Sequence, residues 1–564
     1  MGRKGWRPET IIQWAAILAV FILVVYPLLL LVWGSFRTDL PFRPGTHTLK
    51  NYATIFTSKA DLRAVWNTLV VAISATLLAT FIGTTLAWIT GRTNTPFRRS
   101  LEVFSIFPFF LSPFIGALAW SDLANPSNGF LNIFLRFFVG GDEGPLNIYT
   151  IYGMIFVMGI YFAPYVFLFT ASALKAMDPA LEEASRIAGV NTFKTSLKVT
   201  LPLVAPSILS GSLLAFVNAA EQFGIPGVLG IPSKTYVITT RIFFKTTMYP
   251  SDYAIAAAFA MILMILTGIV IYIQRGILGK RSYITVTGKG YQPRLINIGG
   301  WRYVSFSICM IYFLLAVALP YLDLLLASFL SYQTPKITWD LFTLENYHHI
   351  LFEFPITYRA ILNSITLATA SATILMILTF VISYIIIRTQ TPGRRILDYF
   401  STVPIAVPGL VLGVALLWTY ITNPIPIYNT MWILLVAYVT RYIPFGVRAT
   451  SSALIQIHPE LEESSRIHGG SWLRTMRKVT VPLLKSGMLG GWILCFVAVI
   501  KNLSISILLY AHGTEIIPVA IWALWYDGQY PDVAAMAMIQ TILIYVAIYI
   551  AMKATKADSL LKLA

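Results

Sequence analysis

The feature that most constrains this chain of 564 residues is a series of long apolar segments that recurs from one end to the other. A bilayer core about 30 Å thick is crossed by about 20 helical residues, and twelve segments meet that length. Because 57% of the residues are hydrophobic and only 12% are charged, too few charges are present to cover a water-soluble protein of this size. The sequence therefore predicts an all-α polytopic membrane protein and excludes a secreted or cytosolic enzyme. The predicted spans are 11–34, 66–90, 101–120, 149–174, 206–228, 252–274, 304–328, 360–387, 399–420, 430–452, 487–510 and 533–552.

The distribution of basic residues predicts the orientation of these spans. The chain carries 41 Lys and Arg against 24 Asp and Glu, and the basic residues lie in short segments between the apolar blocks. When the N-terminus is placed inside, the inner segments hold 28 of these basic residues and the outer loops hold 11. Cytoplasmic loops of membrane proteins carry such an excess of Lys and Arg. We therefore expect both termini to be cytoplasmic, and we interpret the positive charge as a topology signal, with no nucleic-acid partner.

Comparison of the chain with itself reveals an internal repeat. Residues 92–99 read RTNTPFRR after the second predicted span, and residues 388–395 read RTQTPGRR after the eighth, at an offset of 296. The segments 48–52 and 343–347 share the pattern Thr-Leu-x-Asn-Tyr. Farther along the chain the offset falls to 280, so the first half carries 296 − 280 = 16 additional residues near its outer loop, 121–148. A repeat of this kind reveals architecture that hydropathy alone leaves ambiguous.

Each half of the chain contains six predicted spans. Because six is an even number, both copies enter the membrane in the same direction, and the halves are parallel repeats. We expect a first six-helix repeat at 1–276, a cytoplasmic linker at 277–303 and a second six-helix repeat at 304–564.

The most specific repeated element lies on the predicted cytoplasmic side. Residues 178–189 read DPALEEASRIAG, and residues 458–469 read HPELEESSRIHG. When 178–205 is compared with 458–485, 14 of 28 positions are identical without a gap, whereas unrelated segments share about two. This similarity marks a duplicated structural unit.

Each copy of this element predicts a compact elbow of two short helices. Asp178 is placed to cap the first helix, and the two glutamates that follow favour its positive N-terminus. Gly189 suits a left-handed helix stop, and Asn191 starts a second helix that we expect Pro202, or Pro482 in the second copy, to break. A single elbow has an alternative interpretation as an amphipathic segment on the lipid headgroups. Two copies in parallel halves instead favour docking, because a pseudo-twofold unit presents two similar handles to a twofold partner.

These motifs resemble the EAA loops of permease subunits from binding-protein-dependent ABC importers. The matching patterns are Glu-Ala-Ser and Glu-Ser-Ser, each followed by a glycine and by Val-Thr-x-Pro; both depart from Glu-Ala-Ala only by small residues. The resemblance implies a type I importer permease fold in which each elbow inserts into a groove of an ATPase subunit. The residues expected to couple the chain to the ATPase are Glu182, Glu183, Ala184, Arg186, Gly189 and Pro202 in the first half, and Glu462, Glu463, Ser464, Arg466, Gly469 and Pro482 in the second.

The resemblance also implies a cargo and partners. Two permease units in one chain are similar to the ferric-iron permease group, which has relatives for thiamine, polyamines, phosphonates and sugar phosphates. The implied partners are two copies of an ABC ATPase subunit and an extracytoplasmic solute-binding protein, and the implied location is a bacterial inner membrane. The sequence contains no Gly-x-x-x-x-Gly-Lys-Ser/Thr phosphate loop, so ATP hydrolysis is expected in separate subunits. No cofactor is expected.

Charged residues within spans mark a candidate pathway, because they are costly to bury in lipid. Glu221 follows Asn218 in the fifth span, and Lys501 precedes Asn502 at the equivalent place in the eleventh. We expect these four residues to lie on the translocation pathway. The charges of Glu221 and Lys501 are expected to form an ion pair that seals the closed pore or, alternatively, to contact the substrate. Arg441, in the tenth span, is expected to snorkel toward the outer interface.

The sequence predicts no metal site. A single deep carboxylate, Glu221, cannot build a tight site, so high affinity for a metal cargo is expected in the binding protein. We interpret the His348–His349 pair as outer surface, and Cys309 and Cys495 as buried fillers. Two other classes stay open: an ion-coupled secondary carrier, which has no need for a doubled elbow, and a membrane-embedded enzyme, for which no nucleophile–base constellation appears.

Overall fold

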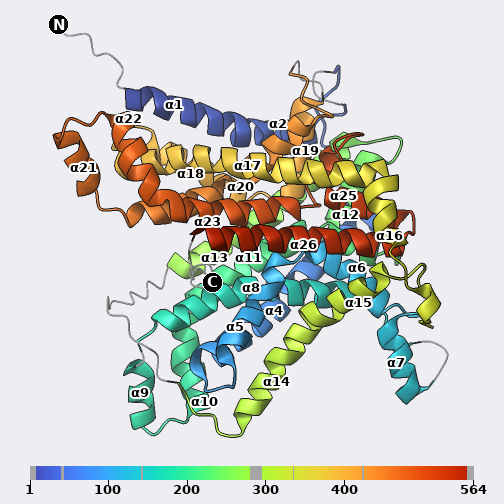
Figure 1. The fold of residues 1–564 in the computed structure, drawn as a ribbon. Helices are drawn as coiled ribbons and strands as arrows, with labels where there is room; N and C mark the ends of the chain where they lie inside the picture. The colour runs from blue at the N-terminus through green and yellow to red at the C-terminus, as the bar shows by residue number, and fades with distance from the viewer. Residues whose placement is uncertain are drawn as a thin grey trace.

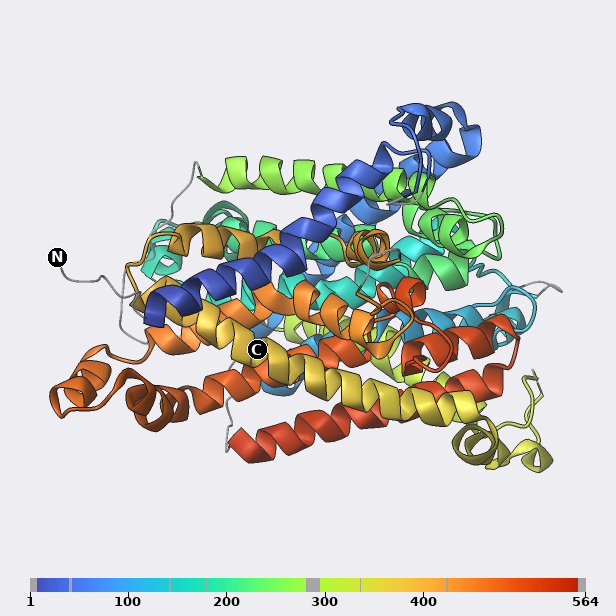
Figure 2. The same ribbon diagram turned by 90° about the horizontal axis from the view of Figure 1, so that it is seen from above.

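The computed structural model describes residues 8–39, 43–140, 144–178, 180–279, 295–334, 336–421 and 425–555. These residues form helices joined by turns, and their β-structure is limited to isolated bridges. The long helices run side by side, with α9 (Ala180–Ile187) and α21 (Glu460–Ile467) at one end of the molecule and α7 (Phe130–Val139) and α16 (Glu345–His348) at the other (Figures 1 and 2). The prediction of an all-α polytopic membrane protein is confirmed.

Nine helices in the described part of the chain are long and apolar enough to cross a membrane. Two bent helix pairs raise the number to 11, and α20 (Met431–Ile455), which carries Arg441 and Arg448, is a further long helix. Together they occupy the twelve predicted segments. The nine are Ile11–Ser35 with α1 (Pro8–Val20) and α2 (Tyr26–Ser35), α4 (Lys59–Arg92), α8 (Ile151–Ala176), Ser196–Glu221 with α11 (Leu201–Glu221), Tyr253–Gln274 in α13 (Tyr253–Gly279), Trp301–Ser328 with α14 (Trp301–Phe313) and α15 (Leu319–Ser328), α17 (Pro355–Arg388), Trp472–Ile500 with α23 (Val481–Ile500), and Tyr530–Ile550 in α26 (Tyr530–Thr555).

The predicted spans 101–120 and 399–420 are broken helices, a feature that the apolar length alone did not predict. They are α5 (Arg98–Phe110) with α6 (Pro113–Leu123), bent by 96°, and Arg394–Ile405, which contains α18 (Arg394–Thr402), with α19 (Gly409–Tyr420), bent by 111°. Pro113 opens α6 and Pro408 directly precedes α19. Since proline lacks a backbone N–H and clashes with the preceding turn, a helix breaks there, although the mean hydropathy of the segment does not change.

The repeated Thr-Leu-x-Asn-Tyr segment has the same structural role in both halves. The Asn51 amide donates hydrogen bonds to the Ser35 and Arg37 carbonyl oxygens, at 2.9 and 2.8 Å, just past the end of α2. The Asn346 amide does the same for the Ser328 and Leu330 carbonyl oxygens past the end of α15, at 3.0 and 2.8 Å. Each asparagine therefore satisfies carbonyl groups that the end of a helix leaves unpaired.

The first helices of the two halves are exchanged. α1 and α2 pack against α17, α18 and α19, which follow much later in the chain, whereas α14 and α15 pack against α5 and α6. The two halves therefore interlock. The boundaries at 1–276, 277–303 and 304–564 stay a prediction, and residues 280–294 of the linker lie outside the described residues.

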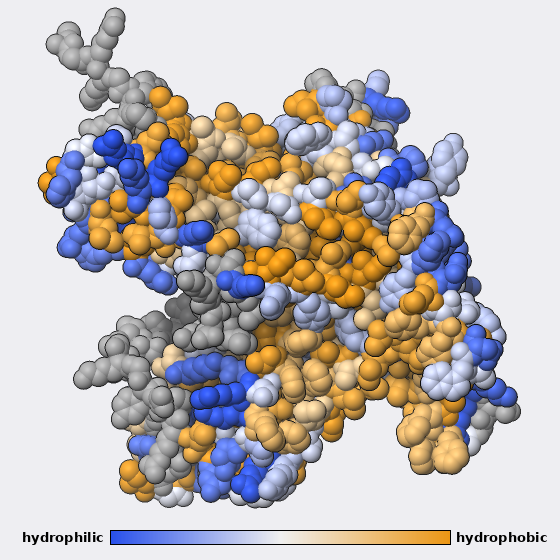
Figure 3. Space-filling view, in the orientation of Figure 1, coloured by the Kyte–Doolittle hydropathy of each residue, from blue (hydrophilic) through white to orange (hydrophobic). Residues whose placement is uncertain are grey.

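The surface in Figure 3 carries an apolar band across the middle, and hydrophilic residues gather toward the two ends of the bundle. Exposed large side chains such as Leu77, Phe81 and Ile377 contribute to the apolar surface of α4 and α17. In a soluble protein such a surface marks an interaction site; on a bundle of bilayer-length helices it is the face that lipid covers.

Candidate functional site

Two elbows project from one end of the bundle, as the duplicated motif predicts. In the first, α9 leads to α10 (Thr192–Thr195); in the second, α21 leads to α22 (Trp472–Thr475). Asp178 accepts a hydrogen bond from the Ala180 amide at 2.9 Å at the start of α9. Gly189 and Gly469 follow the first helices with φ of 80° and 77°, the left-handed conformation that glycine adopts without strain.

The second helix of each elbow does not stop at the proline, so that expectation was wrong. α10 continues through the π-helical turn η2 (Ser196–Thr200) into α11, and α22 continues through η8 (Met476–Thr480) into α23. Pro202 and Pro482 directly follow these turns, at the second position of α11 and α23. The wider π turn accommodates a residue without a backbone N–H, which an α-helical interior does not. The predicted spans 206–228 and 487–510 therefore begin and end too late.

The first glutamate of each Glu-Glu pair points into the protein. Glu182 lies 3.6 Å from the Arg92 guanidinium at the end of α4, and its carboxylate accepts a hydrogen bond from the Thr200 hydroxyl at 2.6 Å. In the second half Glu462 lies 3.6 Å from Arg388 at the end of α17 and accepts from Thr480 at 3.2 Å. Buried ion pairs of this kind are costly to break, so they fix each elbow to a long membrane helix.

The second glutamate and the neighbouring apolar side chains face outward. Glu183 is half-buried and Glu463 is exposed. Ile187 and Ile467 are 88% and 82% exposed. An apolar surface on the projecting end of a membrane protein is typical of a protein interface. Among the other predicted coupling residues, Ala184, Ser464 and Arg466 are exposed, whereas the side chain of Arg186 lies outside the described atoms.

Replacement of Gly469 by alanine is expected to loosen the second elbow by about 1–2 kcal/mol, because a side chain with a Cβ atom disfavours φ of 77°. No atom lies within 4 Å of the added Cβ, so the cost is conformational and not a clash. Faster amide hydrogen exchange over α21 and α22 would report it. Gly268→Ala is the matched control: its Cβ also meets open space, but within helix α13, where alanine is favoured over glycine. Unchanged exchange in Gly469→Ala would contradict the expectation.

A cavity of about 240 Å³ lies between the two halves. Its walls come from the breaks between α5 and α6 and between α18 and α19, together with α8, α11, α20 and α23. The four predicted pathway residues all line it: Asn218, Glu221, Lys501 and Asn502. Arg441 lines it as well. The structure therefore brings the expected residues together and adds a second cation.

The expected ion pair between Glu221 and Lys501 is wrong, because Glu221 binds Arg441. Both carboxylate oxygens of Glu221 accept hydrogen bonds from Arg441 Nη2, at 2.7 and 2.8 Å. Arg441 is only 7% exposed and also donates to the Pro404 and Val407 carbonyl oxygens, so it does not snorkel toward the interface. A planar guanidinium with five donors satisfies all these acceptors at once, which an ammonium group cannot do in this geometry.

Glu221 and Lys501 instead each cap a broken helix of the opposite half. Glu221, the last residue of α11, accepts a hydrogen bond from the Gly409 amide at the start of α19, at 2.5 Å. Lys501, directly after α23, donates to the Phe109 and Leu111 carbonyl oxygens at the end of α5, at 2.6 and 3.5 Å. A carboxylate at a helix N-terminus and an ammonium at a helix C-terminus are both favoured by the helix dipole. The two charges are thus related by the repeat, but each meets a helix end and not the other charge.

The two asparagines have different surroundings. Asn218 donates back to the Leu214 carbonyl oxygen of its own helix at 2.7 Å. Asn502 donates to the Tyr442 hydroxyl at 3.1 Å and accepts from the Ile505 amide at 3.1 Å. The sequence reasoning missed Gly409 and Tyr442, and it gave Arg441 the wrong environment. An arginine within an apolar span was itself a signal, since such residues usually face a bundle interior.

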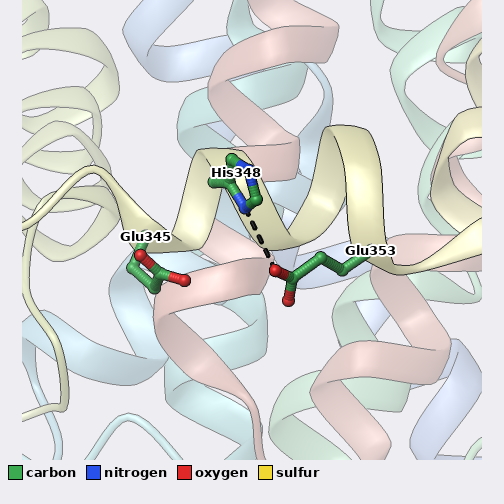
Figure 4. A group of neighbouring side chains, drawn as sticks. All are labelled: Glu345, His348 and Glu353. Carbon is green, nitrogen blue, oxygen red and sulfur yellow. Dashed lines mark ion pairs between the residues drawn. The ribbon is translucent and has the colours of Figure 1, made fainter.

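One group of side chains at the opposite end of the molecule has the residue types of a metal site. Glu345, His348 and Glu353 lie together on α16 and the turn after it, with His348 Nδ1 3.2 Å from a Glu353 carboxylate oxygen (Figure 4). All three are exposed, and no deeper ligand joins them among the described residues. His348 therefore lies on the surface, as expected. His349 instead contacts Asp532 of α26 at 2.9 Å. Cys309 and Cys495 are buried and unpaired, as expected of fillers.

Interlocked helical halves around a charged cavity, with two projecting elbows, define a membrane transport protein. The chain belongs to the family of binding-protein-dependent transport system inner membrane components, whose model matches residues 75–282 and 382–556. The expected resemblance to the permeases of such importers is therefore confirmed, and the protein is a permease of the inner membrane. This membership also decides against the ion-coupled carrier and the membrane-embedded enzyme.

Individual relatives cover almost the whole chain. It is 27% identical to the ferric transport system permease protein FbpB of Actinobacillus pleuropneumoniae over 91% of this chain and 73% of the relative. It is 28% identical to the putative ferric transport system permease protein FbpB 1 of Haemophilus influenzae, over 89% and 78% of the two chains. A probable ABC transporter permease, y4fN of Sinorhizobium fredii, is 24% identical over 96% and 95%. Among solved structures, a bacterial ABC transporter involved in alginate import matches with a TM-score of 0.40 and 20% identity, over 47% of this chain and 93% of that chain.

Proposed function

We propose that this chain is the fused permease of an ATP-driven importer that passes ferric iron from an extracytoplasmic binding protein into the cytoplasm. Two copies of a separate ATPase subunit dock on the two elbows, and both termini lie on that cytoplasmic side. High affinity for iron resides in the binding protein, because the described residues that line the cavity offer one carboxylate, Glu221, and Arg441 already pairs with it. Asn218 and Asn502 line the passage.

The observation that carries this proposal is a continuous helical connection from each elbow to a charge in the cavity. Ser196–Glu221 runs without a break from the end of the first elbow to Glu221, and Trp472–Ile500 runs from the second elbow to the residue before Lys501. At 1.5 Å per residue, helices of this length span about 40 Å. A displacement of the elbow is therefore transmitted as a rigid-body motion to the residue that caps a broken helix of the opposite half.

These connections support a mechanism in which ATP binding moves the cavity walls. Closure of the ATPase dimer draws the elbows together, and the buried Arg92–Glu182 and Arg388–Glu462 pairs carry α4 and α17 along. The shift of α11 and α23 withdraws Glu221 and Lys501 from the ends of α19 and α5. The broken helices then separate and open the cavity toward the binding protein, and ATP hydrolysis reverses the change.

The choice of ferric iron is supported by the two relatives named as ferric transport permeases, each of which covers about nine-tenths of this chain. The test is reconstitution of the chain with its ATPase in proteoliposomes, supplied with candidate binding proteins. We expect the iron-loaded receptor to stimulate ATP hydrolysis and radioactive iron uptake. The contrary result is stimulation by a receptor loaded with thiamine, a polyamine, a phosphonate or a sugar phosphate, with no effect of the iron-loaded receptor. It would rule out iron as the cargo and would still agree with an ATP-driven importer.

A further inference from the structure

Two buried carboxyl groups from different halves meet near the outer ends of the helices. Asp122 lies in the last turn of α6 and Asp323 lies in α15; they are 2% and 4% exposed. The two carboxyl groups are within hydrogen-bonding reach of each other. Because α15 crosses onto α6, this contact is part of the seam between the interlocked halves.

Each carboxyl group has one oxygen beside a neutral donor. The Gln333 amide donates to Asp122 Oδ1, and the Tyr530 hydroxyl, at the start of α26, lies 3.2 Å from Asp323 Oδ2. The single Tyr530 hydroxyl proton has a second acceptor at the same 3.2 Å, the Leu118 carbonyl oxygen. The other two oxygens, Asp122 Oδ2 and Asp323 Oδ1, are buried and meet no N–H or O–H donor of the described residues. Nor does any Lys, Arg or His in the described part of the chain pair with either group.

Two carboxylates that are both ionised are strongly unfavourable side by side in this buried contact. Like charges in contact repel, and each buried oxygen without a donor carries the full cost of its lost hydration. A single proton removes both problems, because it neutralises one carboxyl group and makes it a hydrogen-bond donor to the other. A proton also occupies no separate volume, so close packing around the two carboxyl groups does not exclude it.

The fold itself does not require acids at this seam. By the 296-residue offset, the residue of the second half that corresponds to Asp122 is Trp418 of α19. The helices α13 and α26 correspond as well, and each begins at a tyrosine, Tyr253 and Tyr530. There the fully buried Trp418 donates to the Tyr253 carbonyl oxygen at 3.1 Å. A Cβ atom on Gly34 of α2 would lie 2.6 Å from the Trp418 ring, so the ring packs directly against the backbone of α2. No charged group of the described residues takes part in this contact. The acid pair is therefore specific to one of two related places.

We propose that Asp122 and Asp323 form a binding site for one proton that joins α6 of the first half to α15 and α26 of the second. Gln333 and Tyr530 hold the outer oxygens of the pair, and Tyr149 and Tyr530 are the other titratable groups beside it. The bound proton makes the outer seam sensitive to pH. In the unfolded chain the two carboxyls are separate and lose their protons at about pH 4. The folded protein then holds one more proton than the unfolded chain, so its stability falls as the pH rises through the range in which the pair releases it.

The test compares the full chain in lipid nanodiscs with Asp122→Asn and Asp323→Asn. Infrared spectroscopy is expected to show a protonated-carboxyl stretching band in the parent chain that shifts in D₂O and disappears in each variant. The melting temperature of the parent chain is expected to fall between about pH 5 and about pH 9. Each asparagine supplies an N–H donor in place of the proton, so both variants are expected to melt at a nearly constant temperature, above the parent chain at alkaline pH.

Asp61→Asn is the matched control, since Asp61 is another buried outer acid but forms an ion pair with Arg241 at 3.2 Å. It is expected to lower the melting temperature and to retain the carboxyl band. Absence of the band from the parent chain, or a parent melting temperature that does not change with pH, would overturn the proposal. So would stabilisation of the parent by added Ca²⁺ or Mg²⁺ that both asparagine variants lose, because the pair would then bind a metal ion in place of the proton.

Discussion

Charge reversal at both Glu183 and Glu463 is expected to abolish ATP-driven uptake while the chain stays folded in the membrane. Glu463 is exposed and Glu183 is half-buried, so arginine is expected to be accommodated at both positions without unfolding the elbows. In the proposed complex the same positions face the ATPase, where a reversed charge is expected to oppose docking. Two such contacts are expected to reduce uptake by roughly 100-fold or more. The measurements are uptake in proteoliposomes and co-purification of the ATPase with the variant.

Three further variants separate docking from folding. The double variant with glutamine at Glu183 and Glu463 keeps the size of the two side chains and removes their charge. It is therefore expected to lose less uptake than the double arginine variant. Glu182→Arg places a cation beside Arg92 in a buried site, so it is expected to destabilise the elbow itself. Glu462→Arg does the same beside Arg388. Normal ATPase co-purification and uptake in the Glu183→Arg, Glu463→Arg double variant would refute the docking role.

Replacement of Arg441 by methionine is expected to lower the free energy of unfolding by up to about 3–5 kcal/mol, because it leaves the partly buried Glu221 carboxylate without a charge partner. The Pro404 and Val407 carbonyl oxygens lose their donor at the same time. Glu221→Gln is expected to cost less, since its amide oxygen still accepts the Gly409 hydrogen bond. Denaturant unfolding in mixed micelles or bicelles measures both.

The double variant Glu221→Gln with Arg441→Met completes this experiment. It is expected to recover part of the stability that Arg441→Met loses, because the partly buried carboxylate that lost its partner is then replaced by a neutral amide. Equal stability of Arg441→Met and the parent chain would contradict the pairing. A double variant no more stable than Arg441→Met would show that the carbonyl contacts of Arg441, and not Glu221, account for the loss.

Local signals in the sequence predict much of this fold. Apolar length predicts where the membrane helices lie, because the cost of burying polar side chains in lipid acts on each segment separately. The Asp-Pro start and the glycine stop predict the elbows for the same reason, since caps and left-handed turns depend on neighbouring residues. The breaks after α5 and before α19 were harder to find, because a mean over about 20 residues does not register one proline. At Pro202 and Pro482 the error was the opposite one: the sequence predicted a break at each proline, whereas a π turn lets the helix continue.

The sequence by itself determined the class of protein, the duplication, the elbows and the list of charged residues that enter the membrane. Only the tertiary structure decided the partners: Glu221 with Arg441, Lys501 with the carbonyl end of α5, and Asp122 with Asp323. The physical reason is that a buried charge is satisfied by whichever donors or acceptors lie within about 3 Å of it. Those distances follow from the exchange of first helices between the halves and from the two broken helices, which depend on packing between segments hundreds of residues apart.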